Sequence, residues 1–206
     1  TGGEPLIKRN IITLVDMIRL TGRFEEITMT TNASLLTEEK AIRLKEAGLH
    51  RVNISLDTLD EQIFENITRG GNIKDVFSGI NAAKKAGLFP IKINMIIFEN
   101  TKLEEIEKMK IFCLNNGLTL QTIKQFSLYS NKKDSEALKS SSRPLPCEKC
   151  NRLRLTADGY FKPCLFSNKE IKVDLNNIDE SIDQAVNSKP FCGTTCLNRV
   201  MSQIGG

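Results

Sequence analysis

The chain has 206 residues, of which 40% are hydrophobic and 26% charged, with a formal net charge of +4 at pH 7. This composition predicts a soluble globular protein with one sizeable core, and it excludes a transmembrane helix because no apolar run is long enough. The basic residues are scattered rather than blocked, which suits an anionic small molecule and gives no nucleic-acid signature. Without a secretory signal pattern, we expect a cytoplasmic protein with no nucleic-acid or membrane partner.

Strand and helix patterns alternate along the first two-thirds of the chain. Strand-like runs are expected at residues 26–30, 51–56, 90–97 and 118–123. Helices are expected at residues 10–20, 38–48, 73–86 and 101–115. A strand–helix unit repeating at roughly 30 residues predicts an α/β fold with a parallel sheet and crossover helices. The ligand site of such a sheet lies at the carboxyl ends of its strands.

A different pattern follows the predicted sheet. Residues 127–146 are rich in Ser, Lys, Asp and Pro, and we interpret them as a linker. Strand-like runs at 152–156 and 160–165 are joined by Ala157-Asp158-Gly159, and an Asp-Gly between such runs predicts a hairpin. One further helix is expected at residues 178–187.

The six cysteines lie at positions 113, 147, 150, 164, 192 and 196. Cys147 and Cys150 share a short turn, and the predicted hairpin would return Cys164 to them. Three thiolates in one place repel each other unless a cation neutralises them, so the spacing predicts a metal site. Two alternatives stay open: a four-iron cluster with one open iron, or a zinc site completed by Cys192 or Cys196. Otherwise the last two are free surface thiols.

Other residues have both a functional and a structural interpretation. Arg152 and Arg154 fall on one face of a predicted strand, where two guanidinium groups suit a phosphate or a purine edge, or form an exposed basic face. Lys92 lies inside the apolar run IKINMII, where an ammonium group needs a ligand, a sheet edge or a route to solvent. Cys113 and His50 are interpreted as a small core residue and a loop residue.

Short polar motifs stand at the chain start and at two predicted strand ends. In Gly2-Gly3-Glu4-Pro5 the glycines allow close approach of a ligand to the backbone, and Glu4 could accept a bond from an ammonium group. Thr30-Thr31-Asn32 and Ser55-Leu56-Asp57 carry small hydroxyls and amides that can bind a polar cofactor. Ordinary turn chemistry favours the same residue types.

Together these segments resemble one family. TGGEPL, TTN, NISLD, IKINMII, the block C-x2-C-N-R-L-R-L-T-x-D-G and the terminal IGG are similar to segments of the GTP 3′,8-cyclases. This is the molybdenum cofactor biosynthesis protein A family of radical S-adenosylmethionine (SAM) enzymes. The resemblance covers residues 1–126 and 146–206, and its cysteine block is the most specific part. It implies a partial TIM-like barrel at 1–126 that lacks its first strand or strands. A linker at 127–146 and a cluster- and GTP-binding extension at 147–206 would follow.

The resemblance also implies roles for individual residues. The SAM-binding set would be Gly3, Glu4, Ser55 and Phe126, with the Gly3 backbone binding the methionine amine of SAM and Glu4 supporting that turn. GTP would be contacted by Thr30, Lys92, Arg152 and Arg154. A [4Fe-4S] cluster whose open iron binds guanine would be held by Cys147, Cys150 and Cys164. The Gly205-Gly206 tail would reach into the active site.

The family's reaction begins with reductive cleavage of SAM to a 5′-deoxyadenosyl radical. That radical takes the hydrogen from C3′ of GTP, and the ribose radical closes onto C8 to give 3′,8-cyclo-7,8-dihydro-GTP. The resemblance therefore implies GTP, SAM and a reductant protein as partners, and leaves homodimerisation open.

The chain departs from the family pattern in the C-x3-C-x2-C loop of the SAM-cleaving cluster, which is absent. Since the chain opens on Thr1 without Met, we expect a fragment that makes no 5′-deoxyadenosine alone, with a second [4Fe-4S] cluster only where an upstream segment supplies the loop. Gln121 and Phe126 stand where bacterial relatives have arginine and methionine. A catalytically dead GTP- or SAM-binding relative and a zinc-stabilised interaction module are the alternatives.

Overall fold

The computed structural model describes residues 3–125, 128 and 147–204. The chain forms two compact units, residues 4–125 and residues 126–206 with 1–3. The predicted linker at 127–146, apart from Leu128, and the Gly205-Gly206 tail lie outside the described residues. In the described part of the chain, no helix is both long and apolar enough to cross a membrane.

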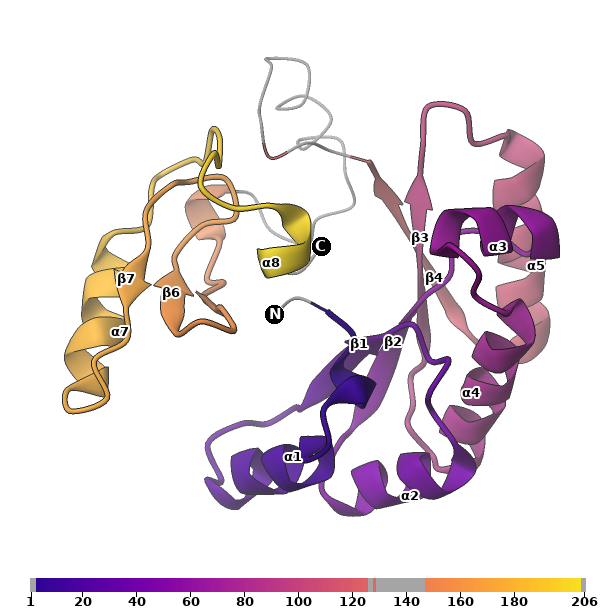
Figure 1. Ribbon diagram of the computed structural model, residues 1–206, viewed down its shortest axis with the longest axis horizontal. Coiled ribbons are helices and arrows are strands. Elements are labelled where there is room, and N and C mark those ends of the chain that lie inside the picture. The colour runs from indigo at the N-terminus through magenta and orange to yellow at the C-terminus, as the bar shows by residue number, and fades with distance from the viewer. Residues whose placement is uncertain (1–2, 126–127, 129–146, 205–206) are drawn as a thin grey trace. The chain divides into compact units, whose positions relative to one another are not determined.

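The N-terminal unit contains a four-stranded parallel sheet in the order β1-β2-β3-β4 (Figure 1). The strands are β1 (Thr28–Thr31), β2 (Arg51–Ser55), β3 (Lys92–Ile97) and β4 (Thr119–Lys124). The helices are η1 (Pro5–Ile7), α1 (Ile11–Leu20), α2 (Glu38–Glu46), α3 (Glu61–Thr68), α4 (Ile73–Lys85) and α5 (Leu103–Asn116). This arrangement confirms the predicted α/β class with crossover helices.

Local sequence signals explain where most of these helices begin and end. The Thr37 side chain accepts a hydrogen bond from the Lys40 amide at 3.2 Å and caps α2. Gly117 ends α5 in the left-handed conformation, with φ of 65°. Helix α3 was not predicted from the sequence. Its only buried residue is Phe64, so it shows no repeated apolar face, although Asp60 caps it through the Ile63 amide at 2.8 Å.

The sheet has one apolar and one polar face because its side chains alternate. Helices cover one face of the sheet (Figure 1). Val52, Ile54, Ile93 and Met95 are fully buried and belong to the core that the sheet shares with these helices. The residues between them point to the opposite face, are partly exposed, and include Arg51, Asn53, Lys92 and Asn94. This second face is where the N-terminal unit can meet a polar ligand.

Helix α4 packs closely on the loop that follows β1. A Cβ built at Gly79 would overlap the carbonyl oxygen of Ala33, a fully buried residue with φ of 61°. The Ala33 amide donates to the Thr31 hydroxyl at 3.0 Å, so this helix supports the carboxyl end of β1.

Gly79→Ala should therefore destabilise the N-terminal unit by about 1–3 kcal/mol, the usual cost of overpacking. Ser78→Ala, at the neighbouring exposed position of α4, should change stability by less than about 0.5 kcal/mol. Urea unfolding followed by far-UV circular dichroism measures both. Equal midpoints for the two variants would contradict the close packing of Gly79.

The C-terminal unit contains an antiparallel sheet in the order β5-β6-β7. Its elements are η2 (Cys147–Lys149), β5 (Arg154–Leu155), β6 (Tyr160–Lys162), β7 (Ile171–Lys172), α7 (Ile178–Asn187) and α8 (Met201–Ile204). The predicted hairpin is confirmed, with Gly159 at φ of 83° in its turn. A second core forms here from Leu128, Leu165, Phe166, Cys196 and Ile204.

Candidate functional site

Three of the predicted ligand-binding residues lie on the polar face or at the carboxyl end of the parallel sheet. Thr30 on β1 and Lys92 on β3 flank Asn53 of β2 in one cross-strand row. Ser55, the last residue of β2, is in register with Asn94 in a neighbouring row. The register thus gathers two hydroxyls, an ammonium and two amides from three strands that are far apart in sequence.

The Glu4 carboxylate is bound to the carboxyl end of β1. Its Oε1 accepts from the Thr31 hydroxyl at 2.5 Å and from the Leu6 amide at 3.0 Å, and its Oε2 accepts from the Asn32 amide at 2.7 Å. Gly3, directly before it, is exposed, with φ of 69° and no atom within 4 Å of a Cβ built there. Glu4 therefore anchors the glycine turn at the strand end and leaves the Gly3 backbone open.

A chain of polar contacts leads to Thr30. The Arg51 guanidinium contacts the Glu26 carboxylate at 2.6 Å and holds the pKa of that carboxyl below its usual range. The same guanidinium donates to Asn53 Oδ1 at 2.8 Å, and Asn53 Nδ2 donates to the Thr30 hydroxyl at 3.4 Å. Arg51 and Asn53 thereby orient a predicted GTP contact, a role that sequence reasoning missed.

Asp57 joins the ends of two neighbouring strands. Its Oδ1 accepts from the Ile96 amide at 2.7 Å. Burial raises the pKa of the Asp57 carboxyl, and the Ile96 hydrogen bond offsets part of that shift. The Leu56 amide donates to the Asn94 carbonyl at 3.0 Å and continues the connection. The predicted strand-end motif SLD is therefore built into the sheet on this side.

Asn94 is a further residue that sequence reasoning missed. Its side-chain Oδ1 is buried and has no hydrogen-bond partner among the described residues. A buried acceptor without a partner costs free energy and needs an explanation. The available signal was its spacing, since Lys92 and Asn94 are polar residues two apart in an apolar strand and so share one face.

The predicted cysteine trio lies in the C-terminal unit. Cys147 and Cys150 stand on one turn, in which the Cys150 amide donates to the Cys147 carbonyl at 3.1 Å. Cys164 follows β6 and is half-buried. Three thiols suit an iron–sulfur cluster by their chemistry. Within the described ranges, however, no group of three or more His, Cys, Asp or Glu side chains is arranged to hold a metal ion. A cluster at these residues stays a prediction.

The remaining cysteines differ from each other. Cys113 is a core residue, as predicted, and burial raises the pKa of its thiol to about 11. Cys192 is exposed. Cys196 is fully buried and its thiol donates to Asn198 Oδ1 at 3.2 Å, so the expectation of a surface thiol is wrong there. Its neighbours belong to a second core that only the fold assembles.

The two predicted arginines of the extension do not share a strand. Arg154 lies in β5, opposite Lys162, whereas Arg152 precedes the strand and is exposed. Strand β5 is shorter than predicted. The Lys189 ammonium bonds the carbonyls of Arg152, at 2.6 Å, and Pro163, at 2.8 Å, and so ties the two sides of the hairpin to the end of α7.

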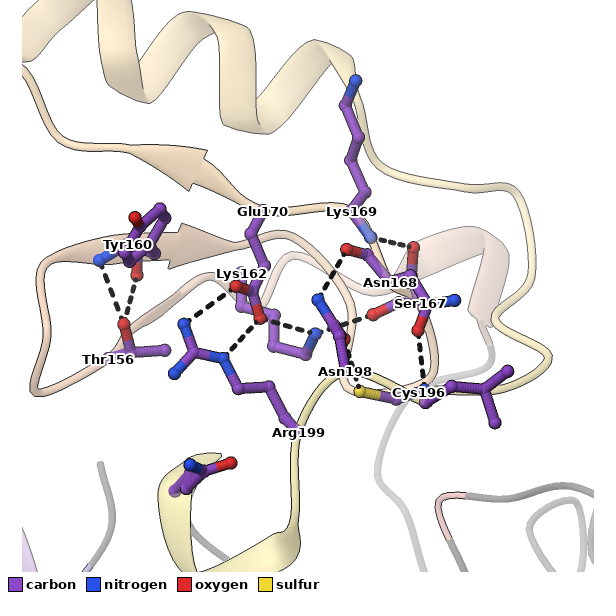
Figure 2. A network of polar contacts seen from close by, with 12 residues as sticks. Thr156, Tyr160, Lys162, Ser167, Asn168, Lys169, Glu170, Cys196, Asn198 and Arg199 are labelled. Atoms are coloured by element: carbon purple, nitrogen blue, oxygen red, sulfur yellow. Dashed lines mark hydrogen bonds and ion pairs between the residues drawn. The ribbon is translucent and has the colours of Figure 1, made fainter.

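A network of charges links the hairpin to the last part of the chain (Figure 2). The Arg199 guanidinium makes two bonds to the Glu170 carboxylate, at 2.9 and 2.8 Å, and one to Asp158 at 2.8 Å. The fully buried Lys162 ammonium contacts Glu170 at 3.2 Å and the Ser167 carbonyl at 2.7 Å. Sequence reasoning missed this network because its members come from four separate segments.

The pKa of Glu170 is lowered, first by the hydrogen bond from Arg199 and then by Lys162, against the effect of burial. A carboxyl with a depressed folded pKa contributes stability that is fully present above its unfolded value of about 4.3 and is lost as the pH falls through the folded value. We therefore expect the C-terminal unit to lose stability below about pH 4. Urea unfolding midpoints at pH 6, 4 and 3 measure this loss, and the midpoint of Glu170→Gln should depend less on pH than that of the wild-type chain. An equal pH dependence of the midpoint in the two proteins would contradict the role of Glu170.

Phe126, the fourth predicted SAM contact, lies outside the described residues, as do Thr1 and Gly2. The other predicted site residues lie within the described ranges. Four of those predicted for SAM or GTP belong to the N-terminal unit, namely Glu4, Ser55, Thr30 and Lys92.

Comparisons with known proteins agree with the resemblance seen in the sequence. The family model of the Radical SAM superfamily matches residues 1–113, and that of Molybdenum Cofactor Synthesis C matches residues 95–191. The chain is 33% identical to the GTP 3′,8-cyclase of Thermodesulfovibrio yellowstonii, covering 100% of this chain and 80% of the relative. It is 38% identical to the GTP 3′,8-cyclase of Peptoclostridium acidaminophilum, covering 83% of this chain and 65% of the relative. It is 32% identical to that of Listeria monocytogenes, covering 100% of this chain and 80% of the relative.

Solved structures support the fold. Streptococcus suis SuiB bound to S-adenosylmethionine superposes with a TM-score of 0.57 at 17% identity, covering 79% of this chain and 48% of that one. The radical SAM enzyme coproporphyrinogen III oxidase (HemN) from Escherichia coli gives a TM-score of 0.50 at 14% identity, covering 70% of this chain and 34% of that one. The radical SAM match spans more than half of the sequence, and relatives about one-third identical align along all of it. The chain therefore belongs to the GTP 3′,8-cyclase family of radical SAM proteins.

Proposed function

We propose that this protein serves the GTP 3′,8-cyclase reaction of molybdenum cofactor biosynthesis, with SAM as co-substrate. The observation that carries the proposal is the succession of a radical SAM match and a Molybdenum Cofactor Synthesis C match in one chain. Relatives named GTP 3′,8-cyclase align over its full length. The polar face of the sheet supports the proposal because it offers donors and acceptors for a nucleoside.

The SAM methionine group is assigned to the glycine turn. The Gly3 backbone would bind its ammonium, and Glu4 would hold that turn rather than touch the ligand, since both its oxygens already accept bonds. The Ser55 hydroxyl stands at the end of β2 and would contact the same molecule. Phe126 completes the proposed set.

Four residues are proposed to bind GTP through the chemistry of their side chains. Thr30 and the Lys92 ammonium lie in one row of the sheet and would bind polar or anionic groups of the nucleotide. Arg152 and Arg154 would add guanidinium donors from the extension. When bound, a [4Fe-4S] cluster held by three cysteines supplies an open iron to which a guanine can coordinate.

The first test is metal content and binding. After anaerobic reconstitution with iron and sulfide, we expect the chain to hold iron and to bind GTP, and Cys164→Ser to lose most of that iron. Zinc in place of iron would favour the zinc-stabilised module and contradict the cyclase proposal. Metal analysis and calorimetric titration with GTP measure both.

The second test is turnover with SAM, GTP and dithionite. Because the 206 residues contain no C-x3-C-x2-C motif, we expect no 5′-deoxyadenosine from this chain alone. A longer form that carries the motif should form 3′,8-cyclo-7,8-dihydro-GTP. Ligand binding without product in that form would indicate the catalytically dead relative.

The unpartnered Asn94 acceptor gives a prediction about ligand chemistry. Oδ1 can receive a bond only from a donor, so a ribose hydroxyl of SAM or GTP, or the ammonium of SAM, fits it and an ionised phosphate does not. Asn94→Leu, similar in size, should leave the free protein equally or more stable and weaken one ligand by about tenfold.

Calorimetric titration with SAM and with GTP separately identifies which ligand donates to Asn94. Asn94→Asp keeps the acceptor and should retain most of the affinity. Unchanged affinity for both ligands in Asn94→Leu, together with lower stability, would show that Asn94 serves the fold alone.

A further inference from the structure

Two segments of the C-terminal unit lie against each other although they are far apart in sequence. The cysteine loop, residues 164–170, begins at Cys164, and the strap, residues 193–199, precedes α8. A Cβ built at Gly193 would lie 2.6 Å from the Cys164 sulfur and 2.8 Å from the Phe166 carbonyl oxygen. The strap backbone therefore covers one side of the thiol, and a side chain at Gly193 would have to displace the sulfur.

Hydrogen bonds join the strap to the cysteine loop along its length. The Thr194 amide donates to the Phe166 carbonyl at 2.9 Å. Further along, the Leu197 amide donates to Asn168 Oδ1 at 2.6 Å, and Asn198 Nδ2 donates to the Asn168 carbonyl at 3.0 Å. The two segments thus share several bonds between the thiol and the far end of the loop.

Arg199 fixes that far end. Its guanidinium forms a two-bond fork with Glu170, the last residue of the cysteine loop (Figure 2). It makes a third bond with Asp158 of the hairpin turn. It also lies over the Tyr160 ring, 5.5 Å from the centroid. With a side chain only 12% exposed, Arg199 is held from several directions.

We propose that Arg199 is a positioning residue for Cys164: by holding the strap on the cysteine loop, it determines how far the thiol is covered and where it can meet a metal. The inference rests on the proposed function only for what Cys164 binds, because coverage of the thiol is a property of the protein alone. The strap contacts Cys164 at its first residue, Gly193, and its last residue, Arg199, is bonded to Glu170.

The test is the reactivity of individual thiols in the folded, metal-free full chain. Iodoacetamide labelling followed by peptide mass spectrometry gives the rate at Cys164 relative to exposed Cys147 in the same molecule. Arg199→Met should raise this ratio by about tenfold or more, as expected for losing charge-assisted hydrogen bonds. Arg199→Lys, which keeps the charge but not the fork, should restore part of the protection. Arg43→Met, at an exposed pair on α2, should leave the ratio unchanged.

Cys196 lies in the strap itself, so hydrogen exchange at the amides of α7 reports whether the unit stays folded. If the Cys164 ratio is unchanged in Arg199→Met while the α7 amides stay protected, the proposal is overturned. If the α7 amides lose their protection, Asp158→Asn decides, because it weakens one of the three hydrogen bonds to Asp158 and Glu170 that hold Arg199. That variant should raise the ratio a few-fold with the α7 amides protected, and an unchanged ratio would overturn the proposal.

Iron uptake is measured on the same variants as a separate readout. Arg199→Met should hold less iron than the unchanged chain after the same reconstitution, and Arg199→Lys should recover part of it. If the wild-type chain binds no iron, the proposed function is contradicted, but the labelling result at Cys164 still stands. Failure of the proposed function can therefore be distinguished from failure of the positioning role of Arg199.

Discussion

Replacing Glu170 by leucine should destabilise the C-terminal unit by about 3–5 kcal/mol, a large share of a domain's stability. Glu170 is the shared acceptor for two cations, Lys162 with a fully buried side chain and Arg199 with 12% exposure. Removing the carboxylate leaves the buried Lys162 ammonium with the Ser167 carbonyl, at 2.7 Å, as its remaining hydrogen-bond partner among the described residues. A buried charge that loses its counter-charge is among the most costly defects a fold can carry.

The measurement must report on the C-terminal unit itself, since two units can unfold separately. Hydrogen exchange at the amides of α7, followed across a urea series, does so. Asp183→Leu is the matched control, because this carboxylate is exposed on α7 of the same unit, and it should cost less than about 1 kcal/mol. Similar losses for the two variants at this probe would contradict the buried-pair account.

The second large effect is expected at the opposite end of the chain. Glu4→Gln should weaken SAM binding by about tenfold to a hundredfold, the equivalent of one charge-assisted hydrogen bond. The Glu4 carboxylate accepts from Thr31, Asn32 and Leu6, whereas glutamine would turn an NH2 group toward one of these donors. The glycine turn would then lose its connection to β1, and the Gly3 backbone its position.

Calorimetric titration of SAM into the folded protein measures this effect. Glu46→Gln, at an exposed position of α2, is the control and should bind SAM like the unchanged chain. Undiminished SAM affinity in Glu4→Gln, with the fold intact by circular dichroism, would contradict the assignment of the glycine turn to SAM.

The sequence by itself determined the class of fold and the order of its elements. Apolar spacing predicted the four parallel strands and most of their helices, because side-chain periodicity follows directly from backbone geometry. Thr37, Gly117 and the Asp158-Gly159 turn marked boundaries correctly, since capping and turn chemistry act within a few residues. Motif similarity indicated the family, which the comparisons then showed.

Only the tertiary structure decided which polar groups meet. It bound the Glu4 carboxylate to the end of β1, left Asn94 Oδ1 buried without a partner among the described residues, and placed Cys196 in a core. It also joined Arg199 to Glu170, across 29 residues of sequence. The physical reason is that a charge or an amide has no period of its own. Its partner is set by how distant segments pack, and that information is absent from any local stretch of the chain.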